Sequence, residues 1–102
     1  MSEPSFVRYL GDADFHDGRV LDLERREQSI TVRVRGGSGR VFVVEFGNVL
    51  HFRAIQPEGM LLYALSEFTG PPPLRRFVFA NWDDEAKSIL EVEAETIQVR
   101  PE

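Results

Sequence analysis

The chain contains no cysteine, which excludes disulfides, thiolate metal sites and cysteine nucleophiles. It also has no apolar run near the roughly 20 residues that a membrane-spanning helix needs. Its first residues, MSEPS, have neither the basic nor the apolar region of a signal peptide. We therefore expect a soluble, cytoplasmic protein with no membrane partner.

Familiar catalytic motifs are missing as well. The sequence has no His-Glu-x-x-His zinc motif and no Gly-x-Ser-x-Gly nucleophile turn. Only two histidines are present, His16 and His51. Together with one carboxylate they could supply the three ligands of a hydrolytic zinc site, so a metal-dependent hydrolase is the least favoured alternative. We predict a non-enzymatic protein with no catalytic residue, no metal and no cofactor.

The 12 basic residues are outnumbered by 17 acids, and they do not form a nucleic-acid signature. Arg33, Arg35 and Arg40 surround a glycine turn, but the ribonucleoprotein motif is absent and the net charge is −5. We therefore predict no nucleic-acid partner. These arginines are expected to pair with acids on neighbouring strands, among them Glu24, Glu45 and the C-terminal glutamates.

Residues 29–46 are the stretch around which the rest of the chain is organised. Residues 29–35 alternate apolar and polar side chains, which is the period of a half-buried strand. Residues 36–39, Gly-Gly-Ser-Gly, suit a short turn. Residues 40–46 are apolar on both faces, so we expect this second strand to be covered on both sides and to lie at the centre of the sheet.

Other strands are bounded by turn signals. We predict strands at 19–26, with Leu21 and Leu23 facing inward, and at 75–81. Residues 5–10 are an edge strand or a helical turn. Residues 60–69 fit a helix face or a buried strand, and their length and flanking breakers favour the strand.

Two strands contain an irregularity. After Gly47-Asn48, residues 49–55 are either a returning strand or a bulged continuation of the preceding one. In residues 88–100 the apolar positions change from even to odd numbers, which predicts a bulge near Glu95 and Thr96. One all-β domain covering 1–102 is expected, an antiparallel sandwich or partly open barrel of about six to seven strands with at most one short helix.

Two groups of polar residues are candidate sites. The first is a polar turn of possible ligands, Asp14, His16 and Asp17; its spacing does not match a calcium loop, and we expect the aspartates to accept backbone N–H groups there. The second is acidic. Residues 81–102 hold seven acids against Lys87 and Arg100, so the whole net charge lies in this last part of the chain. The acids we predict to bind a basic partner are Asp83, Asp84, Glu85, Glu91, Glu93 and Glu95.

Three segments carry a family resemblance: Phe15-His16-Asp17-Gly18-Arg19-Val20, Val44-Glu45-Phe46-Gly47-Asn48-Val49 and Leu90-x-Val92-x-Ala94-x-x-Ile97-x-Val99. The chain resembles small uncharacterised bacterial all-β proteins, some of which are similar to immunity proteins of polymorphic toxin systems. Such proteins bind and inhibit one cognate toxin. The resemblance implies a bacterial protein-binding domain and carries over no catalytic residue.

These observations give one leading hypothesis for the function and two alternatives from other functional classes. The leading hypothesis is a non-enzymatic, immunity-type binding protein whose acidic C-terminal strand face contacts a basic protein. An alternative is a small-ligand-binding or structural domain that forms a homodimer through an exposed edge strand. The hydrolase with a zinc site is the third.

Overall fold

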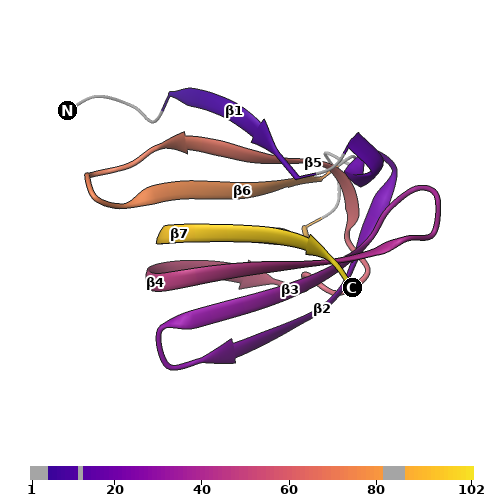
Figure 1. Ribbon diagram of the computed structural model, residues 1–102, viewed down its shortest axis with the longest axis horizontal. Coiled ribbons are helices and arrows are strands. Elements are labelled where there is room, and N and C mark those ends of the chain that lie inside the picture. Colours follow the sequence, from indigo (N-terminus) through magenta and orange to yellow (C-terminus); the bar gives the residue numbers. More distant parts are fainter. Residues whose placement is uncertain (1–4, 12, 82–86) are drawn as a thin grey trace.

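The computed structural model describes residues 5–11, 13–81 and 87–102. Over these residues the chain forms seven strands and one short 3-10 helix (Figure 1). The elements are β1 (Phe6–Leu10), η1 (Ala13–Phe15), β2 (Gly18–Arg26), β3 (Ser29–Arg35), β4 (Val41–Ile55), β5 (Leu61–Thr69), β6 (Arg75–Asn81) and β7 (Ile89–Pro101). The predicted all-β class is confirmed. In the described part of the chain no helix is long and apolar enough to cross a membrane.

All the strands belong to one antiparallel sheet that curls back on itself. Its order is β1-β5-β2-β3-β4-β7-β6, and β6 also pairs with β5. The pairings therefore follow one another round a ring, but β2 meets β5 only at Gly18 and Arg19, which lie opposite Leu62 and Leu61. The sheet is consequently a partly open barrel and does not close regularly. In Figure 1, β1, β5 and β6 lie toward the top and β2, β3 and β4 toward the bottom, with β7 between them.

The predicted hairpin is present as β3, the glycine turn and the first half of β4. The ladder runs from Ile30 opposite Phe46 to Arg35 opposite Val41. β4 lies between β3 and β7, and its successive residues Val43 and Val44 are both buried, so this part of the strand is covered on both faces. The core is built mainly from the inward side chains of this hairpin and its neighbours: Phe15, Val20, Ile30, Val32, Val34, Phe42, Val44, Phe46, Met60, Leu62, Leu65, Phe77, Phe79, Leu90, Val92 and Ala94.

β4 is longer than the hairpin because it does not reverse at Gly47-Asn48. Residues 49–55 are the bulged continuation of the strand, and the alternative of a returning strand is wrong. Asn48 has a φ of 51°, and the register with β7 shifts between Val49 and His51. An extra residue in one strand of a pair produces this kind of shift.

β7 changes its inward positions as predicted. The even positions 90–94 are buried, whereas Ile97 and Val99 pack against the core from odd positions. The bulge predicted near Glu95 and Thr96 is wrong, because β4 and β7 both advance by three residues between the Phe46–Ile97 and Val49–Ala94 pairs, which keeps their register. Both strands therefore change their buried positions together at this point, and the register shift lies further along, between Val49 and His51.

The conformations of β1, β2 and β5 agree largely with the prediction. Residues 61–69 form a strand and not a helix, and residues 6–10 are an edge strand that pairs with β5. In β2 the sequence predicts that Leu21 and Leu23 face inward. Leu23 does pack against the core, but Leu21 does not. The register with β3 shifts between Val20 and Asp22, so Val20 takes the buried position.

One acid is buried within the sheet. Glu67 of β5 is 4% exposed, and Arg75 of β6 donates two hydrogen bonds to its carboxylate at 2.9 and 2.8 Å. Arg8 of β1 lies 3.4 Å from the same carboxylate. These partners, the hydrogen-bonding Arg75 above all, hold the pKa of Glu67 below its ordinary value. An ionised Glu67 therefore ties β1, β5 and β6 together.

Candidate functional site

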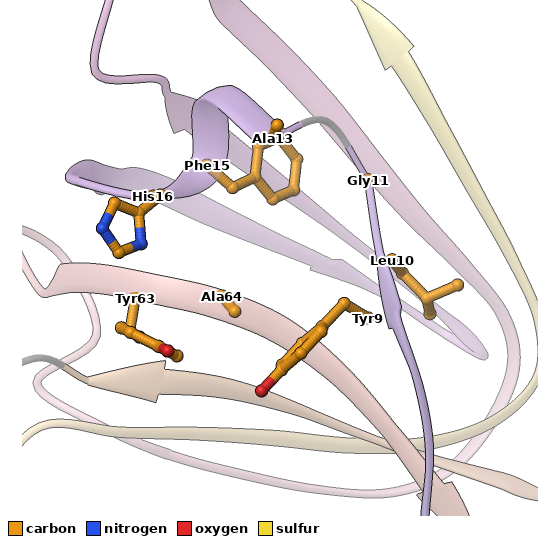
Figure 2. A pocket seen from close by; sticks show the side chains of 8 residues that line it. All are labelled: Tyr9, Leu10, Gly11, Ala13, Phe15, His16, Tyr63 and Ala64. Atoms are coloured by element: carbon orange, nitrogen blue, oxygen red, sulfur yellow. The ribbon is translucent and has the colours of Figure 1, made fainter.

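A pocket of about 350 Å³ opens where the end of β1, η1 and the start of β5 meet. It is lined by Tyr9, Leu10, Gly11, Ala13, Phe15, His16, Tyr63 and Ala64. Figure 2 shows the rings of Tyr9 and Tyr63 on either side of Ala64, with His16 beside Tyr63. The volume falls within the roughly 300–1,000 Å³ typical of ligand pockets. None of the described lining residues is Asp, Glu, Lys or Arg, so the pocket suits an uncharged apolar or aromatic group.

The η1 wall of the pocket depends on Gly11 and Phe15. Gly11 has a φ of 79°, and a Cβ at this position would lie 2.5 Å from the ring of Phe15. Glycine therefore allows both the turn after β1 and the close approach of the ring. The Phe15 ring is buried and meets Phe42 of β4 edge-on, with 5.2 Å between centroids. The wall is thus anchored to the central hairpin.

Exposed aromatic side chains continue from the pocket along β1. Tyr9 is 62% exposed and Phe6 is 50% exposed, and their ring centroids are 4.8 Å apart. Phe6 also meets Phe68 of β5 edge-on at 5.9 Å. Within the described residues β1 pairs with β5 alone, so its outer edge has no neighbouring strand. We call the set Phe6, Tyr9, His16 and Tyr63 the aromatic surface.

Asp14 fastens η1 to the glycine turn. Its Oδ1 accepts a hydrogen bond from the Ser38 N–H at 2.9 Å, and its Oδ2 accepts one from the Ser38 hydroxyl at 2.7 Å. Its backbone carbonyl accepts the Gly37 N–H at 2.8 Å. The hydroxyl bond is the main cause of a lowered pKa at Asp14. Asp14 accepts a backbone N–H as predicted, although the donor belongs to a distant turn.

His16 lines the pocket, whereas Asp17 lies outside the pocket lining. His16 meets the Tyr63 ring edge-on at 5.2 Å and lines the pocket. Asp17 has a φ of 65°, is exposed, and leads into β2. Of the three residues predicted as a polar turn site, one therefore lines the pocket, one supports its wall and one lies outside its lining.

The two histidines do not share a site. His51 of β4 lies opposite Glu93 and lines a separate cavity of about 130 Å³. Within the described residues, no group of three His, Cys, Asp or Glu side chains is placed to hold a metal ion. A hydrolytic site built from His16 and His51 gains no support from this arrangement.

The predicted acidic face is partly neutralised by neighbouring strands. Arg76 of β6 forms an ion pair with Glu93 at 2.6 Å, and the Glu93 side chain is only 17% exposed. Glu91 lies opposite Arg53 of β4. Glu91 and Glu95 are half-buried and form no ion pair within the described residues. Three of the predicted acids lie outside the described residues: Asp83, Asp84 and Glu85.

The arginines of the hairpin follow the predicted pairing only in part. Arg33 contacts Asp22 at 2.6 Å and Glu102 at 2.7 Å, which raises the pKa of the guanidinium. Arg40 lies over the ring of Phe42, 5.0 Å from its centroid. Neither Arg40 nor Arg35 forms an ion pair among the described residues, so the predicted pairing is wrong for these two.

Sequence reasoning missed the tyrosines. The chain has two, Tyr9 and Tyr63, and both line the pocket. Each tyrosine lies in a predicted strand close to a turn, and tyrosine is frequent at binding surfaces. This position could have marked both as candidate site residues. Their proximity depends on the pairing of β1 with β5, which the sequence pattern does not specify.

Comparisons with protein-family models, curated proteins and solved structures found no match.

Proposed function

We propose that this protein is a non-enzymatic binding domain that recognises a protein partner through the aromatic surface. The observation that carries the proposal is the position of Tyr9. Its ring is both a wall of the pocket and part of the exposed aromatic row along β1. A partner that inserts one side chain into the pocket would therefore also cover Tyr9 and Phe6.

The chemistry of the surface indicates the kind of group it receives. Because its described lining carries no formally charged side chain, the inserted group is an apolar or aromatic side chain of the partner. Tyrosine is enriched among residues that dominate binding energy, and such residues cluster in pockets surrounded by weaker contacts. If the immunity-type resemblance holds, the partner is a cognate toxin.

The acidic face is the second surface to consider for a partner. The Arg76–Glu93 ion pair and the position of Arg53 opposite Glu91 reduce its field. Contacts with a basic protein would have to compete with these arginines. For this reason we place the principal contact at the aromatic surface and treat the acidic face as an alternative that the same experiment decides.

The test begins with affinity capture of the partner from the native host, followed by its identification and purification. Titration calorimetry then compares the wild type with Tyr9→Ala. Loss of a central aromatic contact should weaken binding by about 30-fold, since such residues contribute about 2 kcal/mol or more. The matched control is Leu50→Ala, because Leu50 is also 62% exposed and lies outside the aromatic surface.

Three results would contradict the proposal. A purified partner that binds Tyr9→Ala and wild type equally would remove the aromatic surface from the interface. Equal weakening by Leu50→Ala would show that the effect is not specific. Recovery of a small molecule in the pocket with no protein partner, or of a homodimer alone, would favour the ligand-binding or dimeric alternative.

A further inference from the structure

Two arginines stand directly opposite each other at one end of the β2–β3 ladder. Arg19 of β2 is the register partner of Arg35 of β3, and both are exposed. Their neighbours Val20 and Val34 are buried, so both arginines project from the outer face of the sheet. Directly opposite residues in an antiparallel pair have Cβ atoms about 4.5–5.5 Å apart, so the two cationic side chains leave the sheet side by side.

Several other arginines of this outer face are paired with acids, whereas Arg53 of β4 forms no ion pair among the described residues. Arg33 contacts both Asp22 and Glu102. Arg26 contacts Glu24 at 2.9 Å, and Arg100 contacts Glu45.

In the described part of the chain, by contrast, neither Arg19 nor Arg35 is in an ion pair. Asp17, the nearest described acid along the chain, is in none either. Like charges directly opposite each other destabilise a sheet. The pairing of Arg19 with Arg35 is therefore not explained by the stability of the isolated fold.

The residues beside the two arginines are apolar. Leu61 of β5 is the register partner of Arg19, and Val41 of β4 is that of Arg35. The row across the sheet therefore reads Leu61, Arg19, Arg35, Val41. Each guanidinium group is planar and carries several N–H donors, a geometry that matches the oxygens of a carboxylate or phosphate.

We propose that Arg19 and Arg35 form an oxyanion-binding site that takes a phosphate or carboxylate group. The bound anion supplies the ion pair that Arg19 and Arg35 lack among the described residues. Neither arginine lines the aromatic pocket. A test of anion binding is therefore independent of a test of the proposed protein partner.

The test uses inorganic phosphate and acetate as probes, each against chloride at matched ionic strength. The Nε–H signals of the arginine side chains are followed by NMR during the titration. We expect a saturable shift of the Arg19 and Arg35 signals, and loss of at least tenfold in affinity in Arg19→Gln or Arg35→Gln. Response to phosphate alone or to acetate alone would identify which oxyanion the site prefers.

The matched control is Arg53→Gln, because Arg53 is exposed and forms no ion pair among the described residues. Thermal melting adds a second readout. In chloride at low salt, Arg19→Gln should melt at a higher temperature than wild type, because it removes a like-charge contact, yet it should lose the stabilisation by the anion. A linear shift without saturation, equal loss in Arg53→Gln, or a lower melting temperature of Arg19→Gln in chloride would overturn the proposal.

Discussion

Asp14 connects two parts of the chain that are 24 residues apart. Its carboxylate holds both the N–H and the hydroxyl of Ser38, so η1 and the glycine turn are fixed to each other. We expect Asp14→Ala to speed amide exchange of Ser38 by about tenfold or more, because the N–H loses its acceptor and the turn opens locally. Hydrogen exchange followed by NMR measures this directly.

Asp17→Asn is the control for that experiment, because asparagine tolerates the positive φ of this position. Asp17 lies three residues further along the chain and is exposed, and it accepts no hydrogen bond from Ser38. This substitution should leave exchange at Ser38 unchanged. Equal acceleration in both variants, or none in Asp14→Ala, would show that the carboxylate of Asp14 does not hold the turn.

Glu67 makes the stability of the protein depend on pH. Its pKa in the fold lies below the ordinary value of 4.5. A group of this kind stabilises the fold above its unfolded-state pKa, and the contribution is lost as the pH falls through the folded-state value. We therefore expect the free energy of unfolding to fall below pH 4.5, and Glu67→Gln to remove part of that fall.

Urea unfolding between about pH 3 and 7 tests this dependence. At neutral pH, Glu67→Gln should cost about 1–2 kcal/mol, because Arg8 and Arg75 lose their partner but remain partly hydrated. Glu58→Gln is the control, since Glu58 is exposed and in no described ion pair. If the free energy of unfolding changes with pH in the same way in wild type and Glu67→Gln, the arginine partners do not lower the pKa of Glu67.

Among the elements, β4 is the one on which the rest of the sheet depends. Its residues 41–46 pair with β3 on one side, and residues 42–46 pair with β7 on the other. Amides in this segment should exchange among the slowest in the protein, because they open only when the sheet unfolds. Fast exchange there would contradict the central position of β4.

Gly47 of β4 lies opposite Thr96 of β7. A Cβ at Gly47 would lie 2.4 Å from Thr96 Oγ1. We expect Gly47→Ala to destabilise the protein by about 1–2 kcal/mol through overpacking. The cost should largely disappear in the Thr96→Ala background, measured as a double-mutant cycle by urea unfolding. Additive losses would show that the contact with Thr96 is not the cause.

The sequence predicted most of these elements because alternation is a local property. The period of two in residues 29–35 specified a strand with one buried face, and β3 has that pattern. The position of the bulge could not be predicted in the same way. The change of phase in β7 coincides with one in β4 and leaves their register unchanged, whereas the extra residue lies between Val49 and His51 of β4.

At the scale of the whole molecule, the candidate site depends on contacts between distant segments. The polar turn at 14–17 was visible in the sequence, and His16 does line the pocket. Tyr63 reaches the same pocket only because β5 lies beside β1. The acidic pattern of β7 was also visible, but the arginines that reduce its charge come from β4 and β6, which alternation within one strand does not reveal.

The acidic face gives a whole-molecule prediction that separates the two candidate surfaces. Changing Glu91, Glu93 and Glu95 together to Gln should alter the affinity for the purified partner by less than about threefold at physiological salt, since rim charges affect mainly the association rate. Stability should fall modestly, because Arg76 loses Glu93. Calorimetry at two salt concentrations measures the affinity, and urea unfolding measures the stability. A large loss of affinity would move the principal contact to the acidic face.

The most direct test of the account is a map of the partner on the protein surface. Backbone amide shifts of the isotope-labelled protein are recorded by NMR with and without the purified, unlabelled partner. We predict that the largest shifts fall in β1, in η1 and at the start of β5, where the aromatic surface lies. Largest shifts in β7, with β1 and η1 unchanged, would contradict it.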